Sequence, residues 1–246
     1  MDFDSDGVRL HYELHGPEDG PPIVLVHGFA SDYQLNWVGT RWQDTLTKAG
    51  QRVIGLDCRG HGSSDKPHDP ADYALEIMAA DVRRLLDHLQ ISAANYLGYS
   101  MGGKIGVQAI LDFPKRIDRA VLGGVGWGGA FRAAKEIAKA LRGGPIESPV
   151  AKTFYEFAKA RPTNDLEALA ACILGPQPEP DSKALAAIKN PILVVVGDGD
   201  DIVSGVDWLI EHIPTAKLVR VAGRNHMSAV PAGDFKRAAL EFLGDD

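Results

Sequence analysis

Four short apolar runs, separated by longer segments of helical spacing, constrain the fold of this chain more than any other feature. Each run closes in glycine or aspartate and is rich in β-branched residues, as expected of strands buried on both faces of a parallel sheet. Alternation of such strands with helices predicts an α/β fold with a mostly parallel sheet flanked by helices. The runs are Ile23–Val26, Val53–Leu56, Ala94–Leu97 and Ile192–Val196.

Further elements extend this pattern toward both ends of the chain. Asp6-Gly7 is a turn pair, and the residues after it, Val8–Leu14, alternate in a strand-like way, which predicts an opening β-hairpin. Additional strands are expected at residues 119–125 and 217–221. The expected helices cover residues 37–49, 73–89, 101–113, 206–213 and 232–243.

Residues 127–187 depart from the alternation of strand and helix. They follow a glycine-rich stretch and contain helical pieces rich in Ala and Lys, separated by Gly and Pro breakers. We therefore predict a core made of residues 1–126 and 188–246, with a small helical cap, residues 127–187, inserted after the sixth strand. Trp127, Phe154 and Phe157 are the aromatic candidates for a pocket wall, although the spacing of the latter two is also typical of packing.

Length and charge narrow the class of protein. A chain of 246 residues suits one domain, and a net charge of −7 without clusters of Lys and Arg argues against a nucleic-acid partner. No apolar run reaches the roughly 18 to 20 residues of a membrane span, and the start lacks a secretory pattern. We expect a cytoplasmic protein with a small-molecule substrate and no membrane partner, and the sequence leaves the oligomeric state open.

Cysteine and histidine usage indicates neither a disulfide nor a metal site. The two cysteines, Cys58 and Cys172, are far apart in a chain with no sign of secretion, so two unreactive thiols are expected. The eight histidines lack the spacings that bring several ligands to one metal. We expect no metal and no cofactor.

Gly98-Tyr99-Ser100-Met101-Gly102 matches the pattern G-x-S-x-G, with a buried strand before it and a helix after it. A sharp turn between strand and helix raises a serine hydroxyl above the sheet edge, and small residues at either end leave room for the strained backbone. A glycine-rich turn that serves only packing is the structural alternative. The context favours Ser100 as a nucleophile.

This motif, together with His27-Gly28-Phe29 and the segment Asp57–Ser64, resembles the α/β-hydrolase superfamily. The resemblance extends over nearly the whole chain and is weakest in the cap. It implies a serine hydrolase of the carboxylesterase type, in which the catalytic residues follow in the order serine, acid, histidine. A serine at this position excludes those relatives that use an aspartate there to displace halide or open epoxides.

The resemblance assigns His226 as the base. It lies in Gly223-Arg224-Asn225-His226, a loop expected after a strand and just before the last helix. His212 is a poorer candidate because it falls inside a predicted helix.

Three carboxylates compete for the role of the acid that orients the base. They follow the strand Ile192–Val196, and Asp200 fits the register of the family. Asp198 is the next candidate, and Asp198 and Asp201 are also suited to bonding backbone amides in the loop. Some relatives carry the acid one strand earlier, but residues 123–130 contain neither Asp nor Glu.

The resemblance also implies an oxyanion hole made of backbone N–H groups. Met101, which follows the nucleophile, supplies one donor, and Phe29 in the His27-Gly28-Phe29 turn supplies the other. His27 and the segment Asp57–Ser64 are expected to hold these loops rather than to take part in catalysis.

The expected reaction is hydrolysis of a carboxylic ester of a small molecule through an acyl-enzyme intermediate. Hydrolysis of a lactone, a thioester or a carbon–carbon bond, and perhydrolysis without a cofactor, use the same three residues and stay open. A small-molecule receptor that retains the three residues but turns over slowly or not at all is the alternative from a different class.

Overall fold

The computed structural model describes residues 1–127 and 133–244, in which eight strands form one sheet. The strand order is β1-β2-β4-β3-β5-β6-β7-β8, with β1 and β2 antiparallel and the remaining strands parallel. This confirms the mostly parallel α/β sheet. The strands are β1 (Asp2–Ser5), β2 (Val8–His15), β3 (Pro22–Val26), β4 (Arg52–Leu56), β5 (Ala94–Tyr99), β6 (Ile117–Gly123), β7 (Ile192–Gly197) and β8 (Ala216–Val221).

The four apolar runs form the inner strands β3, β4, β5 and β7, whose residues are almost all buried. The opening hairpin is confirmed, with Asp6 and Gly7 at positive φ in its turn. Strand β6 starts at Ile117, two residues earlier than expected, because Ile117 pairs with Ala94 at the start of β5. It ends at Gly123, since Gly124 turns the chain at a φ of 57°.

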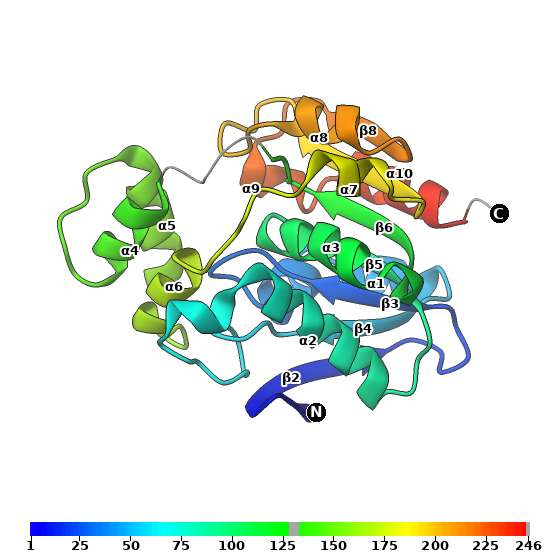
Figure 1. Cartoon of the computed structure of the whole chain (residues 1–246), viewed down its shortest axis with the longest axis horizontal. Coiled ribbons are helices and arrows are strands. Elements are labelled where there is room, and N and C mark those ends of the chain that lie inside the picture. The colour runs from blue at the N-terminus through cyan, green and yellow to red at the C-terminus, as the bar shows by residue number, and fades with distance from the viewer. Residues whose placement is uncertain (128–132, 245–246) are drawn as a thin grey trace.

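Helices cover both faces of the sheet and create two apolar layers (Figure 1). One layer lies under α2 and α3 and continues toward the helices at the end of the molecule. The other lies under α1 and α10. The helices on the sheet are α1 (Trp42–Lys48), α2 (Leu75–His88), α3 (Met101–Asp112), α8 (Val206–His212), α9 (His226–Ala229) and α10 (Gly233–Gly244), with short 3₁₀ turns at Pro70–Tyr73 and Pro114–Arg116.

The prediction of a single helix at residues 37–49 is wrong in one respect, because the helix is interrupted within this range. A π-helical turn covers Gln34–Val38, Arg41 adopts a left-handed conformation with a φ of 64°, and α1 begins at Trp42. Residues five apart on one helix point about 140° away from each other. The break allows Trp37 and Trp42 to be fully buried together, with ring centroids 6.1 Å apart.

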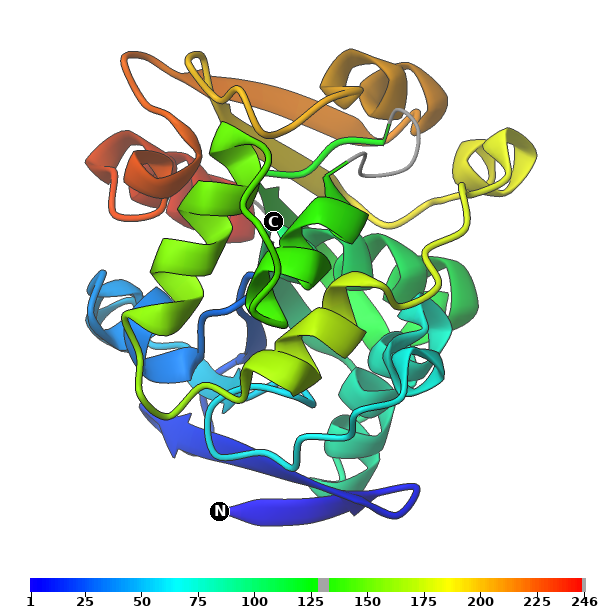
Figure 2. The same ribbon diagram turned by 90° about the vertical axis from the view of Figure 1, so that its left-hand side faces the viewer.

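Between β6 and β7 the chain forms a separate group of helices. The helices α4 (Ala134–Leu141), α5 (Pro149–Lys159) and α6 (Leu166–Ile173) lie at one end of the molecule, where α4 contacts both α5 and α6 (Figure 1). Figure 2 turns this end toward the viewer, with the three helices in front of the rest of the chain. The short α7 (Ser182–Ala186) contacts α8 instead. Residues 128–132 of the predicted insertion lie outside the described residues, and the division at 127–187 stays a prediction.

The structure places both cysteines in the core. Cys58 and Cys172 are free, buried thiols, and burial raises the pKa of both above the ordinary value for cysteine.

Within the described ranges, no helix has both the length and the apolar character needed to cross a bilayer.

Candidate active site

Ser100 occupies the sharp turn between β5 and α3. Its backbone has a φ of 54°, a conformation that is strained for a residue with a side chain. Gly98 and Gly102 must be glycines because backbone atoms of neighbouring segments lie too close for a Cβ. A Cβ on Gly98 would lie 2.3 Å from the carbonyl oxygen of Gly102, and a Cβ on Gly102 would lie 2.1 Å from that of Val26. The G-x-S-x-G pattern thus reflects contacts at this turn.

The structure brings Ser100, His226 and Asp200 into one hydrogen-bonded chain. The distance from His226 Nε2 to Ser100 Oγ is 3.0 Å, and that from His226 Nδ1 to Asp200 Oδ2 is 2.8 Å. An ionised carboxylate only accepts, so Nδ1–H donates to Asp200 and Nε2 accepts from the Ser100 hydroxyl. The side chain of Ser100 does not cap α3, which leaves the hydroxyl available to the imidazole.

Asp200 is almost completely buried, with 2% of its side chain exposed. Burial alone would raise its pKa, but the hydrogen bond and charge of His226 and two backbone N–H groups outweigh burial and hold the pKa below its ordinary value. Those N–H groups belong to Ile202 and Val203, each 3.1 Å from Oδ1. Asp200 is therefore ionised at neutral pH.

The other two carboxylates of this loop point elsewhere. Asp198 Oδ1 accepts a hydrogen bond of 2.8 Å from the backbone N–H of Gly223, and Asp201 is exposed. Among the three candidates, Asp200 is the one in contact with His226.

His226 is the first residue of the one-turn helix α9 rather than part of an irregular loop. Asn225 caps this helix in a reciprocal arrangement with Ser228. The Tyr99 hydroxyl, next to the nucleophile in sequence, donates a 2.5 Å hydrogen bond to the carbonyl oxygen of His226. The cap fixes the local helix, and the bond from Tyr99 holds the histidine backbone against the turn at Ser100.

The loop after β3 lies directly beside the nucleophile. A Cβ on Gly28 would stand 3.4 Å from the Cβ of Ser100, and Phe29, Ser100 and Met101 line the same cavity. The structure gives the backbone N–H groups of Phe29 and Met101 no acceptor among the described residues. Both expected oxyanion donors thus belong to residues that line a cavity together with Ser100, and their catalytic role stays a prediction.

Two buried histidines hold the loop that carries Phe29. His27 Nδ1 donates to the carbonyl oxygen of Gly28, and its Nε2 accepts from the N–H of Cys58. His61 Nε2 accepts from the N–H of Ala30 at 3.1 Å, while its Nδ1 donates to the carbonyl oxygen of Arg59. Burial lowers the pKa of both imidazoles, that of His61 to about 3. Each is a neutral ring that uses both nitrogens to hold backbone.

We expect the stability of the folded chain to fall as pH decreases from about 6.5, the ordinary pKa of histidine. The unfolded chain takes up a proton at His61 in this range, whereas the folded chain stays neutral until its pKa of about 3. This residue alone should lower the free energy of unfolding by up to about 1.4 kcal/mol per pH unit between about pH 6 and pH 4. Urea unfolding at several pH values measures the slope.

The matched variant is His61→Gln, which keeps a polar side chain but removes the titrating ring. Its free energy of unfolding should depend less steeply on pH than that of the original chain. Equal slopes in the two proteins would contradict the inference that buried neutral His61 resists protonation.

Sequence reasoning missed several residues that hold the site together. Asn36 Oδ1 accepts from the N–H of Gly28 at 3.2 Å, although Asn36 lies in no recognisable motif. From the helical group, Arg161 forms an ion pair with Asp32, and Asn164 Nδ2 donates to the carbonyl oxygen of Ala30. The last two contacts span more than 120 residues of sequence, so no local pattern could have revealed them.

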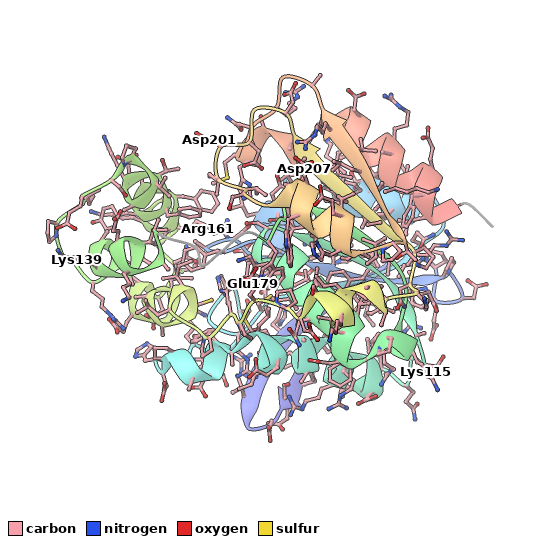
Figure 3. All side chains as sticks on the ribbon, turned by 45° about the horizontal axis from the view of Figure 1, so that its top comes forward. Lys115, Lys139, Arg161, Glu179, Asp201 and Asp207 are labelled. Carbon is pink, nitrogen blue, oxygen red and sulfur yellow. The ribbon has the colours of Figure 1, made fainter. Side chains whose placement is uncertain are left out.

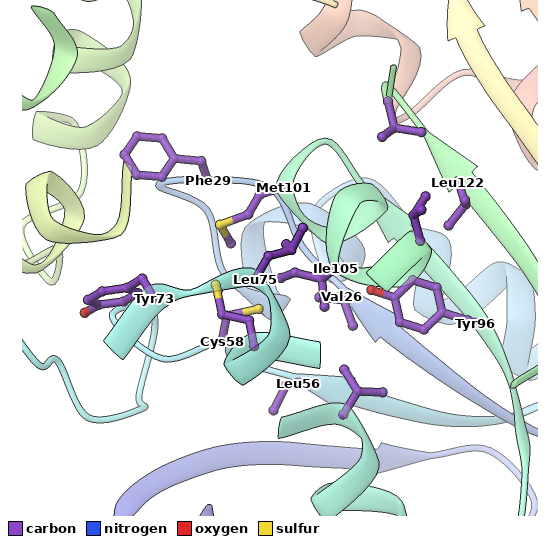
Figure 4. Close-up of a cluster of buried hydrophobic side chains, with 14 of the residues drawn as sticks. Val26, Phe29, Leu56, Cys58, Tyr73, Leu75, Tyr96, Met101, Ile105 and Leu122 are labelled. Atoms are coloured by element: carbon purple, nitrogen blue, oxygen red, sulfur yellow. The ribbon is translucent and has the colours of Figure 1, made fainter. Parts of the chain in front are cut away.

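Two cavities open onto Ser100 and His226. The smaller, of about 330 Å³, is mostly apolar and includes Phe154 and Phe157, two of the aromatic candidates. The larger, of about 750 Å³, contains Trp127, the third candidate, and also Met101 and several charged side chains. Met101 lies over the buried apolar cluster with Leu75 and Ile105, so its backbone rests on packed core (Figure 4).

Comparison with known proteins identifies the fold family. Residues 21–141 match a family described by the α/β-hydrolase fold. The 3-oxoadipate enol-lactonase 2 of Acinetobacter baylyi is 28% identical over 254 residues, which cover 92% of this chain and 89% of that protein.

Two solved structures are similar over their whole length. A hydrolase from Pseudomonas aeruginosa PA01 superposes with a TM-score of 0.83 and 28% identity, covering 100% of this chain and 98% of that one. The enol-lactonase from Burkholderia xenovorans LB400 has a TM-score of 0.78 and 26% identity, with both chains covered completely.

Proposed function

Because the chain is a hydrolase of the α/β-hydrolase superfamily, we propose that it cleaves a carboxylic ester of a small molecule. In this proposal Ser100 is the nucleophile, His226 the general base and Asp200 the acid that orients it. The observation that carries the proposal is the unbroken hydrogen-bond chain from Ser100 Oγ through His226 to the buried carboxylate of Asp200.

Acylation begins when Ser100 Oγ attacks the carbonyl carbon of the ester. His226 Nε2 takes the hydroxyl proton, and Asp200 stabilises the imidazolium that results. The negative charge moves to the carbonyl oxygen, where the N–H groups of Phe29 and Met101 stabilise it by roughly 3 to 4 kcal/mol per donor. Collapse of this intermediate expels the alcohol, which receives its proton from His226.

Deacylation repeats the same steps with water as the nucleophile. His226 removes a proton from the water as it attacks the acyl-enzyme, and the second tetrahedral intermediate uses the same backbone donors. The acid product leaves and Ser100 regains its proton. These residues account for both halves of the reaction.

A cyclic ester is the second candidate substrate. Two of the similar proteins are enol-lactonases, and both are covered over most or all of their length. Opening of a lactone uses the same attack, except that the alcohol stays joined to the acyl group. Ser100 lines two cavities of about 330 and 750 Å³, which offer space for such a ring.

A panel of open esters, lactones and thioesters tests the proposal by counting turnovers per chain. We expect many turnovers on at least one open or cyclic ester. Mass spectrometry of acid-quenched reactions should then find the acyl group on the peptide that contains Ser100. Absence of turnover across the panel would favour the receptor alternative, and acylation of another residue would contradict the assignment of the nucleophile.

A further inference from the structure

Lys104 lies in the wall of the larger cavity, close to the nucleophile. It follows Ser100 by one turn of α3, and its backbone N–H donates to the carbonyl oxygen of Ser100 at 3.1 Å. One helical turn advances about 5.4 Å along the axis. A substrate whose ester carbon meets Ser100 therefore extends past Lys104 when it fills this cavity.

Within residues 1–127 and 133–244, the ammonium group of Lys104 has only neutral partners. Its Nζ donates to Gln177 Oε1 at 3.1 Å and lies 5.2 Å from the centre of the Trp127 ring. Among the described residues, no carboxylate oxygen lies within 4.0 Å of Nζ. Partial burial lowers the pKa of Lys104, as expected of a cation that is partly removed from water without a counter-ion.

The charged side chains distinguish the two cavities. The described residues that line the smaller cavity include no Lys, Arg, Asp or Glu. The larger cavity contains Lys104, Lys135 and Glu179, and Glu179 pairs with neither lysine. Figure 3 shows Glu179 on the segment that returns from the helical group toward the sheet. An anionic group of a ligand therefore fits the larger cavity better than the smaller one.

We propose that Lys104 binds a carboxylate of the substrate, so that this hydrolase acts on esters or lactones that carry a second, ionised carboxyl group. The inference rests on the proposed ester hydrolysis and adds the chemical class of the substrate. The carboxylate occupies the larger cavity and accepts hydrogen bonds from Nζ, while an apolar part of the substrate fills the smaller cavity. The net charge of −7 repels anions at long range, so recognition of a carboxylate must be local.

A purely structural role is the competing explanation for Lys104. Its bond to Gln177 joins α3 to the segment after α6, and loss of such a tie would impair every substrate alike. Recognition of a carboxylate instead changes the ratio of kcat/KM between a carboxylate ester and its neutral counterpart. This ratio, compared among variants, also cancels differences in intrinsic ester reactivity.

The probes are two sets of matched esters. In the first, 4-nitrophenyl monoesters of succinic, glutaric and adipic acid are compared with 4-nitrophenyl butyrate, pentanoate and hexanoate, which places the carboxylate in the acyl part. In the second, 4-carboxyphenyl butyrate is compared with phenyl butyrate, which places the carboxylate in the alcohol part. Spontaneous hydrolysis is subtracted in each case.

The Lys104→Met variant should lower the selectivity ratio by about 10- to 100-fold for at least one pair, the range expected for hydrogen bonds to a charged group. Lys104→Arg should keep most of the ratio. Gln177→Glu, which supplies an internal carboxylate to the intact lysine, should lower the ratio as well. Lys115→Met is the matched control, because Lys115 lies at the end of the molecule opposite the helices marked by Lys139 (Figure 3).

The proposal is overturned if the selectivity ratio of Lys104→Met stays within twofold of that of the original chain for every pair of esters. This holds even if the variant hydrolyses both esters of a pair more slowly. If the chain hydrolyses none of these esters, the inference is decided by binding, whereas the proposed function fails only if the full panel of open esters, lactones and thioesters shows no turnover. Calorimetric titration of the carboxylate esters into Ser100→Ala, with and without Lys104→Met, then measures affinity. At least tenfold weaker binding in the double variant supports carboxylate recognition, and equal binding contradicts it.

Discussion

Substitution of Ser100 by alanine should lower kcat on a neutral ester by about 10⁶ and abolish covalent labelling by a fluorophosphonate. A loss of this size is expected when the nucleophile of a catalytic triad is removed. The Ser100 hydroxyl is the group at the turn that both faces His226 Nε2 and lines the two cavities. Alanine fits the same backbone without adding atoms. Steady-state kinetics and gel fluorescence of the labelled protein provide the two measurements.

Two controls keep this result interpretable. Thermal unfolding of Ser100→Ala should match that of the original chain, because the substitution removes one oxygen atom from a cavity wall. Ser182→Ala, at the exposed start of α7, should label and turn over normally. Retention of labelling in Ser100→Ala would refute the assignment of the nucleophile.

The Asp200→Asn substitution should reduce kcat by up to about 10⁴, the loss known for the same change in a serine protease. Asp200 Oδ2 accepts from His226 Nδ1 at 2.8 Å and thereby keeps Nε2 free to accept the serine proton. An amide has no charge to stabilise the imidazolium, and its N–H₂ group favours the wrong tautomer. Asparagine has nearly the same shape, so the loop should keep its conformation. The measured quantity is kcat on a neutral ester.

Asp198→Asn is the matched control in the same loop. Its carboxylate bonds the N–H of Gly223 and has no contact with His226, so the loss in rate should stay below about tenfold, or roughly 1.4 kcal/mol of barrier. Reversed effects would mean that Asp198 orients the base in solution. If neither substitution slowed the enzyme by more than tenfold, Ser100 and His226 would act as a dyad.

Local patterns predicted the strands well because burial on both faces leaves a distinctive run of apolar residues. The strands β3, β4, β5 and β7 follow from such runs. The turn at Ser100 follows from glycines that no other residue can replace at these distances. The helix expected at residues 37–49 was wrong because its apolar spacing does not reveal that two tryptophans, Trp37 and Trp42, enter the core from one side. Burial of both tryptophans outweighed the preference for one continuous helix in this segment.

Part of the candidate site could also be predicted from the sequence. Ser100 came from its motif, and His226 and Asp200 came from a family resemblance that supplies their order and register. Their mutual distances did not follow from sequence, because 126 residues separate Ser100 from His226 and 26 separate His226 from Asp200. The same holds for His61 and Asn36, which support the loop of Phe29 through contacts with backbone.

The sequence by itself determined the class of fold and the turn at the nucleophile, because each depends on residue types within a short stretch of chain. Only the tertiary structure decided which carboxylate meets His226, how two cavities share Ser100, and that Lys104 lies among neutral partners. The surroundings of Lys104 arise where Trp127, Gln177 and α3 converge from distant parts of the chain. The energy of a buried charge depends on all the neighbours that packing assembles around it, and no single segment encodes them.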